Sequence, residues 1–473
     1  MQLVEHHAID YVPLKERHGK GWHLWPIWFS GDAHLATLAT GAIGITSGLG
    51  FGWSVIAVLA GCALGTLFMA SHSSQGPELG LPQMIQSRPQ FGYRGALVVW
   101  VFALVTYVGY TVFNEVLFGV AVQDLTATHL SQGALDVLFV VFTLAALVFA
   151  VAGYDAIHVA QRVLAAVVIV ALTLFSIGMV VIGRGSPLLG MGRWLAAPFL
   201  VQLFAAAGYQ LSWSIYVSDY SRYLPRDIGV RSTFFWTFTG AFIGGAWMML
   251  VGDVALALFP KLDIVAAVMA ASDRVVPGFG VVLVVLASLS LVTITTLNFY
   301  GGSLTLLSIL DSFHHIRNPA RARLWALALV GAASTWLSTI AGDNVMQQID
   351  DLLAVLVYLF TPWTAINLVD FFFVRHGHYS VREIFNPRGI YGAWNWRGIS
   401  AYFIGFAVMI PFFKTSFWKG PVTLWLGGAD VSMLVGLPVA ALVYIVACRS
   451  LDLAAERAHI ATADAGLETG LAA

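Results

Sequence analysis

Long apolar stretches follow one another along almost the whole chain, separated by short polar loops. A stretch of about 20 apolar residues is long enough for a helix to cross a lipid bilayer. The pattern therefore predicts an all-α polytopic membrane protein with one transmembrane domain. Twelve spans can be drawn with soft boundaries, at residues 26–49, 52–73, 96–123, 134–153, 158–182, 198–223, 232–258, 277–306, 323–342, 347–373, 398–415 and 428–449.

The first of these spans is unusually polar. The segment Trp28–Gly50 (WFSGDAHLATLATGAIGITSGLG) contains Asp32, His34, three threonines and five glycines. Acidic and imidazole side chains are costly in hydrocarbon unless they face protein, water or an ion, and an interrupted helix is tolerated in a membrane only where its backbone lines a cavity or is covered by protein. The segment is therefore interpreted as a discontinuous helix that lines a small-ligand site. The alternative is a glycine-rich packing helix with its N-terminal cap at Asp32.

The sixth span resembles the first in kind. The segment 198–225 (PFLVQLFAAAGYQLSWSIYVSDYSRYLP) begins apolar and becomes polar between Gly208 and Asp219. Irregular helices at positions one and six fit two five-span halves of opposite orientation, with the substrate bound between the broken helices. This interpretation rests on the placement of the two spans, because no direct similarity between the halves is visible.

Composition narrows the class further. The chain is 59% hydrophobic and only 10% charged, with a mean hydropathy of +0.80, whereas soluble proteins carry roughly 25% charged residues. The net charge of −1 and the lack of a basic tract give no indication of nucleic-acid binding. Cys62 and Cys448 lie in apolar runs, so neither a disulfide framework nor a metal cluster is indicated. The N-terminal stretch has no apolar core typical of a cleaved signal peptide.

Lysine and arginine are distributed unevenly between the two sides of the predicted membrane domain. All 24 fall in the loops and tails or near the ends of the spans, 18 of them on one side and six on the other. Positive residues accumulate on the cytoplasmic side, so both termini are predicted to be cytoplasmic in a plasma or inner membrane. The domain limits that follow are a cytoplasmic N-terminal tail at 1–25, the transporter domain at 26–449 and a cytoplasmic C-terminal tail at 450–473.

Polar side chains recur inside the third span. Tyr107, Tyr110 and Asn114 are spaced so that they share one helix face. An aromatic ring one turn from an amide suits a flat polar heterocycle, since the ring can stack on it and the amide can pair with its edge. The alternative is an interhelical hydrogen bond worth about 1 kcal/mol.

A second polar cluster lies in the eighth span. Thr293, Thr295, Thr296 and Asn298 occur within LASLSLVTITTLNFYGG. The hydroxyls of Thr295 and Thr296 could serve a hard monovalent cation, which prefers oxygen ligands. The alternative is that they bond back to carbonyls one turn earlier, as membrane Ser and Thr commonly do.

Other acidic residues have simpler interpretations, and no enzymatic motif is present in the sequence. Asp219, Asp253 and Asp370 fall near predicted span ends, where interfacial water would solvate them. The sequence has no nucleotide-binding loop, no zinc-binding pair on a helix and no nucleophile elbow. These observations argue against an ATP-driven pump and against a membrane enzyme.

Three stretches together resemble the nucleobase–cation symporter family, which includes cytosine and purine permeases and allantoin and hydantoin permeases. GLPQMIQSRPQFGYRGA at 80–96 is similar to the family's loop between spans two and three. WSIYVSDYSRY at 213–223 and WFSGDAHLATLATGAIG at 28–44 resemble its sixth and first spans. The likeness covers residues 20–310 well. It implies an inverted five-plus-five fold with two extra helices, and alternating access driven by Na⁺ or H⁺.

The resemblance also implies roles for individual residues. By position, Trp213 matches the tryptophan that packs against the heterocycle, and Asn114 matches a third-span amide. Tyr110 replaces the family's usual third-span tryptophan, which keeps a stacking ring but narrows it. The substrate-binding residues implied in this way are Thr37, Tyr110, Asn114, Trp213 and Asn298.

The residues that the resemblance implies for a cation site are matched less clearly than those for the substrate. Ala33 and Ala36 fall where first-span carbonyls hold the cation, and Thr295 and Thr296 match its hydroxyl pair. Aligning on Asn298 would instead put Thr293 at that site. The threonines make Na⁺ geometrically feasible without excluding H⁺, and Asp32, His34 and Glu115 are candidate proton carriers because burial brings such groups into the titration range. Asp32 and His34 could equally form a structural pair near the cytoplasmic end of the span.

The sequence therefore predicts a secondary symporter that imports a nucleobase or a related ring, with no cofactor beyond the coupling ion. Cytosine, purines, uracil and allantoin, hydantoin or vitamin-type rings are the substrates considered. An amino-acid or small-amine carrier on the same helical plan is the alternative, although two aromatic rings and two amides suit a heterocycle better than a carboxylate. A membrane enzyme or a sensor is the third hypothesis.

Overall fold

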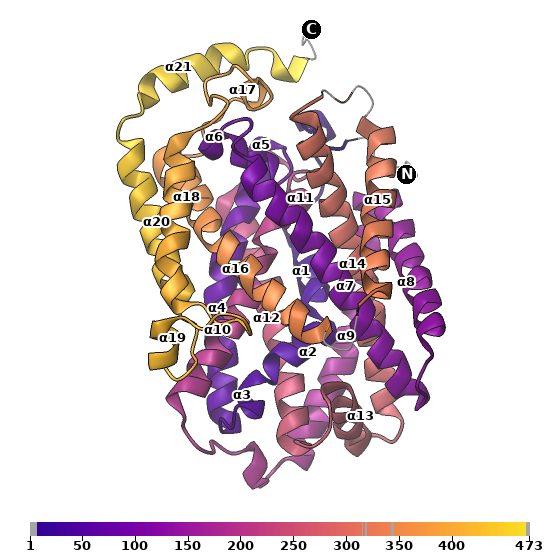
Figure 1. The fold of residues 1–473 in the computed structure, drawn as a ribbon. Coiled ribbons are helices and arrows are strands. Elements are labelled where there is room, and N and C mark those ends of the chain that lie inside the picture. Colours follow the sequence, from indigo (N-terminus) through magenta and orange to yellow (C-terminus); the bar gives the residue numbers. More distant parts are fainter. Residues whose placement is uncertain (1–6, 315, 317–318, 342–344, 470–473) are drawn as a thin grey trace.

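The computed structural model describes residues 7–314, 316, 319–341 and 345–469, so Arg317 and the extreme ends of both tails are outside the described residues. The described chain is a bundle of helices whose axes run mostly along the long dimension of the molecule (Figure 1). Each of the twelve predicted spans overlaps helical structure. Ten of them contain one main helix: α4 Phe51–Ser71, α7 Leu97–Thr126, α8 Gln132–Ala152, α9 Tyr154–Ile182, α12 Gly229–Leu258, α14 Phe279–Asp311, α15 Pro319–Thr339, α16 Val345–Val369, α18 Trp396–Met409 and α20 Ser432–Cys448.

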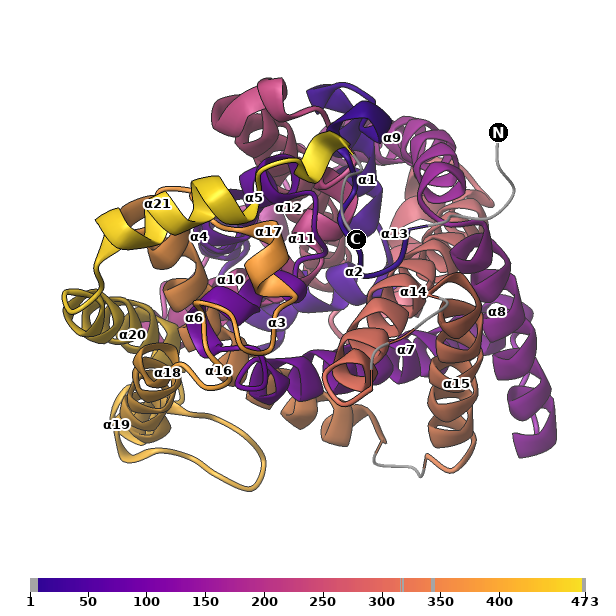
Figure 2. The same ribbon diagram turned by 90° about the horizontal axis from the view of Figure 1, so that it is seen from above.

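The other two spans, the first and the sixth, are divided into shorter pieces. The first consists of α1 Leu24–Asp32, α2 Leu35–Gly41 and α3 Ile43–Thr46. The sixth consists of α10 Ala196–Ser212, the 3₁₀ turn η6 Trp213–Ile215 and α11 Val217–Ser221. Viewed along the bundle, α1, α10 and α12 lie between α18 and α20 on one side and α8 and α15 on the other (Figure 2).

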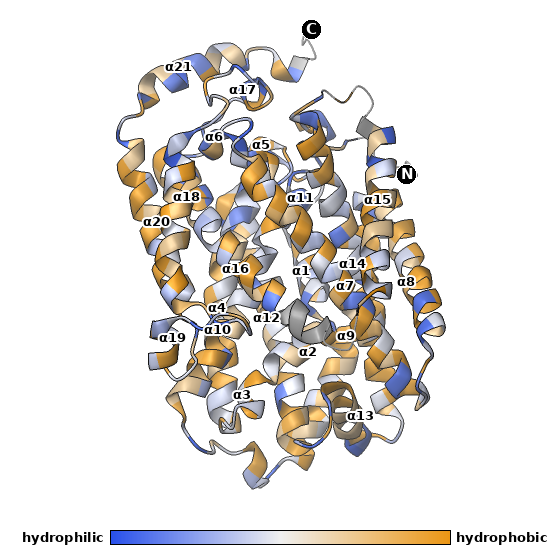
Figure 3. Cartoon of the chain, viewed as in Figure 1, coloured by the Kyte–Doolittle hydropathy of each residue, from blue (hydrophilic) through white to orange (hydrophobic). Residues whose placement is uncertain are grey.

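Length and composition identify seven helices of the described chain as able to cross a membrane, or eight if the pair Ser432–Cys448 and Leu453–Ala463, bent by 84°, is one span. The broken first and sixth spans escape this criterion because their pieces are short. The outer faces of the bundle are largely apolar (Figure 3). Exposed side chains such as Val148, Val163, Leu329 and Leu442 contribute to these faces. The chain is thus a multi-pass membrane protein.

The halves of the first span pack directly on α12. A Cβ atom on Gly244 would lie 2.5 Å from the carbonyl oxygen of Phe29, and one on Gly252 would collide with the carbonyl of Leu38. Only glycine permits this close approach of backbones. The packing covers the interrupted segment with protein, as an irregular backbone in a membrane requires.

The loop 80–96 links several helices at one end of the bundle. The backbone N–H of Gln83 donates to Oδ1 of Asp219 at 2.8 Å, and the Gln83 side-chain oxygen accepts from the Ser218 N–H at 3.0 Å. Gln90 Nε2 donates to Oδ2 of Asp370 at 2.8 Å. Asp219 and Asp370 are therefore buried and bonded, and the expectation of interfacial solvation is wrong for both.

The first and last described segments of the chain meet over the same end of the bundle. The tail after residue 450 forms the helix α21 Leu453–Ala463 and the turn η10 Leu467–Thr469, which lie beside α17 Val381–Ile384 (Figure 1). Asp464 accepts hydrogen bonds from the hydroxyl of Ser380 at 2.7 Å and from the N–H of Val381 at 2.9 Å. Tyr11 donates to Glu468, which also accepts from the N–H of Leu14 at 3.1 Å. We call residues 7–17, α17 and 453–469 the terminal clasp.

Candidate functional site

The first span is interrupted halfway along its length. Helix α1 ends at Asp32, Ala33 adopts φ −87° and ψ 59°, and His34 is extended at φ −142° and ψ 174° before α2 begins. The interruption predicted from the glycines and polar residues is confirmed. Asp32 does not cap the start of a helix, because it is the last residue of α1, so the alternative of a packing helix capped there is wrong.

The sixth span changes its winding at Trp213. The 3₁₀ turn η6 follows α10 directly, and Tyr216, at φ −103° and ψ −22°, separates the turn from α11. This irregularity lies inside the polar stretch that the sequence indicated. It directs the side chains of Gln210 and Trp213 toward the break in the first span.

Asp32 joins the two interrupted spans. Its Oδ1 accepts a hydrogen bond from the indole Nε1 of Trp213 at 2.8 Å, and its Oδ2 accepts from Nε2 of Gln210 at 3.1 Å. The carboxyl group is buried, and its residue is 1% exposed. His34 bonds elsewhere, to the hydroxyl of Tyr209 at 3.1 Å. The two residues flank the break and use different side-chain partners, so the structural pair considered for them is absent from the described contacts.

Thr37 belongs to the same cluster. Its hydroxyl lies 2.6 Å from that of Tyr209 on α10. The structure therefore brings Thr37 and Trp213, both predicted substrate contacts, to one junction of α2, α10 and η6. Tyr209 and Gln210 were missed as members of the cluster, although they lie in the polar part of the sixth span.

The third span contributes aromatic residues and an amide to this region. The hydroxyl of Tyr107 donates to the carbonyl of Ile215 at 3.0 Å, and that of Tyr110 donates to Oγ of Ser212 at 2.9 Å. Asn114 turns toward α14, where its Nδ2 donates to Oγ1 of Thr295 at 3.0 Å. Tyr110 thus lies against the sixth span, and Asn114 lies against the eighth.

Asn298 on α14 reaches the sixth span. Its Oδ1 accepts from the hydroxyl of Tyr216 at 2.8 Å. Its Nδ2 is buried without a hydrogen-bond partner in the described structure, and the residue is 1% exposed. An unpaired buried donor of this kind costs about 1–3 kcal/mol, and a ligand oxygen would satisfy it.

The threonines of α14 face different neighbours. The hydroxyl of Thr296 donates to the carbonyl of Ala146 on α8 and to that of Val292, each at 3.1 Å. Thr293 lies 3.4 Å from Oε1 of Gln161, an oxygen that also accepts from Ser30 of α1 at 2.6 Å. Thr293 is therefore the threonine whose contacts lead to the first span, as the alternative alignment on Asn298 expects.

The first-span members of the predicted cation site lie on the two sides of the break. Ala33 is the non-helical residue itself, and Ala36 lies in the first turn of α2. The carbonyl of Ala36 accepts a hydrogen bond from the hydroxyl of Thr40 at 3.1 Å.

Two acidic residues have surroundings that the sequence did not indicate. Glu115 follows Asn114 on α7 but faces Thr143 of α8 and Thr335 of α15. Asp253 is fully buried, and its Oδ1 accepts from Ser54 of α4 at 2.8 Å, so the expectation of interfacial solvation is wrong here too. A cavity of about 290 Å³ lies outside this cluster, between α5 Gln75–Leu79, the start of α12 and the region after α16. Glu78 pairs with Arg226 at its wall.

The arrangement of these helices and side chains identifies the class of protein. Two interrupted transmembrane helices meet at mid-length around a buried cluster of aromatic, amide and carboxyl groups, which is the architecture of secondary transporters with discontinuous helices. The chain belongs to the family of permeases for cytosine/purines, uracil, thiamine and allantoin, whose family model matches residues 11–436. The family resemblance inferred from the three motifs is confirmed. The members of this family are permeases and not enzymes.

Individual relatives agree with the assignment. The chain is 34% identical over 448 residues to YxlA of Bacillus subtilis, provisionally named a purine-cytosine permease, with 94% of this chain and 95% of the relative covered. It is 23% identical to the purine-cytosine permease fcyB of Emericella nidulans over 93% of this chain and 88% of that one.

A solved structure shares the fold. The nucleobase-cation-symport-1 family transporter Mhp1, solved closed with bromovinylhydantoin bound, superposes with a TM-score of 0.74 over 99% of this chain and 100% of that one, at 16% identity.

Proposed function

We propose that the protein is a secondary active symporter that imports a nucleobase or a related heterocycle by alternating access, coupled to Na⁺ or H⁺. Family membership and relatives named as purine-cytosine permeases support this class of substrate. The observation that carries the proposal is the buried cluster at the junction of the two broken helices. In this cluster Nδ2 of Asn298, which has no partner in the described structure, would donate a hydrogen bond to a ring carbonyl or a ring nitrogen.

The proposed binding site consists of Thr37, Tyr110, Asn114, Trp213 and Asn298. The indole N–H of Trp213 is already used by Asp32, which leaves the face of the ring for stacking on a flat ligand. Tyr110 is a second ring next to the same turn, and Asn114 and Asn298 offer amide groups from α7 and α14. Flat rings with carbonyl and N–H edges match this set, whereas an amino-acid carboxylate would require bare helix-end amides or a cation.

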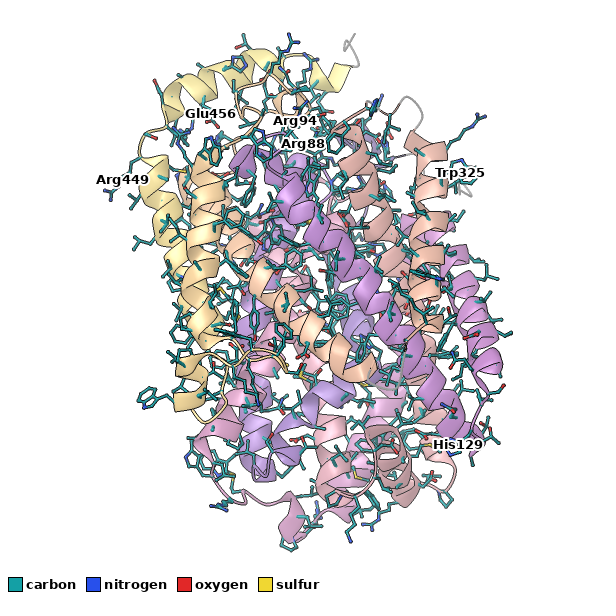
Figure 4. The ribbon with its side chains drawn as sticks, viewed as in Figure 1. Arg88, Arg94, His129, Trp325, Arg449 and Glu456 are labelled. Carbon is teal, nitrogen blue, oxygen red and sulfur yellow. The ribbon has the colours of Figure 1, made fainter. Side chains whose placement is uncertain are left out.

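The membrane arrangement that we propose has twelve spans, an inverted five-plus-five repeat with two further helices, and both termini in the cytoplasm. Arg88, Arg94 and Arg449 lie at the end of the molecule where α21 crosses, opposite His129 (Figure 4). An excess of arginine favours the cytoplasmic side for that end. For a Na⁺ site between α1 and α14, the contacts of Ser30, Gln161 and Thr293 favour Thr293 over Thr296.

The proposal is tested with purified protein in two steps. A thermal-shift screen against nucleobases, hydantoins and amino acids, with and without Na⁺, should raise the melting temperature for a base or related ring. Uptake of that ring into proteoliposomes should then be abolished by Trp213→Ala and by Asn114→Ala, while both variants still reach the membrane. Normal uptake by both variants would refute the proposed pocket, and competition by amino acids alone would favour the amine-carrier alternative.

A further inference from the structure

Two neighbouring residues of α7 point to different parts of the molecule. Asn114 bonds to Thr295 of α14, inside the proposed substrate region. Glu115, about 100° further around the helix, is fully buried against α8 and α15. Oε1 of Glu115 is the acceptor for the hydroxyls of both Thr143 and Thr335, and its Oε2 has no partner in the described structure.

The three oxygen atoms form a closed triangle of hydrogen-bond contacts. Thr143 is bonded to Glu115, Thr335 lies 3.2 Å from the same Oε1, and the two hydroxyl oxygens lie 2.6 Å apart. The two hydroxyl groups supply two hydrogen atoms. With an ionised Glu115, one of these hydrogens has to be shared between two oxygens. A proton on the carboxyl group gives each of the three contacts its own hydrogen.

A metal cation would not explain the triangle as well. Oxygens that coordinate a cation at about 2.4 Å in octahedral geometry are about 3.4 Å from one another. The separations of 2.6 and 3.2 Å here are shorter, as expected for hydrogen bonds. The site therefore suits H⁺ and not Na⁺.

No positive charge neutralises Glu115 in the part of the chain that the structure describes. The titratable or charged side chains of the helices around it have other partners or lie far along their helices. Asp136 of α8 bonds to Gln132, Arg323 of α15 to the carbonyl of Ala150, Tyr300 of α14 to Arg222, Asp311 of α14 to Arg88, and Asp351 and Tyr358 of α16 to Ser416 and Asp430, while Arg321 of α15 lies 14 residues before Thr335. Asp124 lies nine residues further along α7. A buried carboxylate with hydroxyl partners but no positive charge beside it would be costly to ionise, which favours the protonated form.

We propose that Glu115 is the proton-binding site of the transport cycle, and that Thr143 and Thr335 hold its carboxyl group in the conformation seen here. The carboxylate takes up one H⁺ in one conformation and releases it in the opposite one, with no other bond changed. Because α7 carries both Asn114 and Glu115, a shift of α7 relative to α8 and α15 would change the substrate contacts and the triangle together. The inference rests on the proposed function, since it names the coupling ion.

Infrared spectroscopy tests protonation without requiring transport. The spectrum of the wild-type protein at neutral pH, minus that of Glu115→Gln, should contain the carbonyl stretch of one protonated carboxylic acid. The proposal would be overturned if this difference spectrum contained only a carboxylate band and no band from a protonated acid. Asp253→Asn, which changes another buried transmembrane carboxyl group with a single hydroxyl partner, is the matched control for assigning the band.

Transport assays test the coupling. With radiolabelled cytosine in proteoliposomes, Glu115→Gln should retain exchange across the membrane, because the amide can donate in place of the carboxyl proton, but should lose accumulation driven by a proton gradient. Asp253→Asn should retain both activities. Accumulation by Glu115→Gln at the wild-type level, or its loss in both variants, would overturn the assignment. A wild-type protein that binds and exchanges no base at all would instead refute the proposed function.

A third variant guards against misfolding of Glu115→Gln. Thr335→Val keeps the carboxyl group but removes a hydroxyl that donates to it, so the ionised form loses a stabilising hydrogen bond. The pH profile of cytosine accumulation by this variant should shift to higher pH relative to wild type. An unchanged profile would contradict the role of the triangle.

Discussion

The indole nitrogen of Trp213 donates a hydrogen bond to Oδ1 of Asp32 at 2.8 Å, across the junction of the two interrupted helices. The same carboxyl group accepts from Gln210 through its other oxygen at 3.1 Å. Asp32 therefore fixes the rotation of the Trp213 ring from the opposite span. Trp213 and Gln210 are both uncharged, so hydrogen bonds and not an ion pair hold the indole ring in place.

Replacing Asp32 separates this positioning role from the rest of the site. Asp32→Ala leaves the buried indole N–H of Trp213 without an acceptor, at about 1–3 kcal/mol, whereas Nε2 of Gln210 keeps the carbonyl of Ala241 at 3.3 Å. The change should raise the KM for base uptake by about 10-fold or more. Asp32→Asn keeps an oxygen for Trp213, and Gln210 can turn its unpaired Oε1 toward the new amide. Its KM should stay within a few-fold of wild type. Equal losses in the two variants would contradict the positioning role.

Contact between α12 and the broken span should limit stability. Gly244→Ala places a methyl group 2.5 Å from the carbonyl oxygen of Phe29 and should destabilise the fold by about 1–3 kcal/mol. Gly133→Ala on α8 is the control, because its Cβ would meet no atom within 4 Å. Melting of the purified proteins should show a lower transition for the first variant and an equal or higher one for the control. A Gly244→Ala protein as stable as wild type would mean that α12 can move away.

The terminal clasp depends on Asp464. Asp464→Ala removes the acceptor for Ser380, Val381 and Arg382 at the start of α17, a loss comparable with that of a helix cap, about 0.5–2 kcal/mol. Trypsin should then cleave faster after Arg382, and amide exchange in α17 and α21 should accelerate. The exposed Asp227 of η7 provides the control Asp227→Ala. If both variants were cleaved at the wild-type rate, the clasp would not depend on this carboxylate.

The N-terminal part of the clasp should respond to pH through His7. A hydrogen bond to Asp10 at 2.6 Å, with a second to Glu16 at 2.7 Å, raises the pKa of His7 above its ordinary value of 6.5. A raised pKa stabilises the folded segment fully below 6.5, and this contribution is lost as the pH rises through the folded value. Exchange protection of residues 7–16 should therefore fall as the pH rises past 6.5, and His7→Gln should remove that dependence. Protection that rises with pH would contradict the assignment.

The break in the first span could be predicted because its cause is local. Glycine, threonine and acidic residues in an apolar run weaken a helix wherever it packs. The partners of the break could not be predicted in the same way. Asp32 bonds to residues 178 and 181 positions away, and nothing in either segment specifies the pairing.

The burial of individual acidic residues also could not be predicted from the sequence. Asp253 and Asp370 occur close to the ends of apolar runs, yet both are buried, because neighbouring elements cover those ends. Helical periodicity separates Glu115 from Asn114 on α7, but which helices cover its face depends on the packing of α8 and α15. The polar tail after residue 450 has no apolar pattern from which a helix could be predicted. Helix α21 is held by contacts near its ends and by Arg375, which pairs with Glu456 at 2.6 Å.

The bond between Tyr11 and Glu468 connects residues 457 positions apart. During synthesis residue 11 emerges long before residue 468, so this bond can close only after the residues between them have been made. A closed clasp would therefore mark a chain in which all the helices from α1 to α21 have been synthesised.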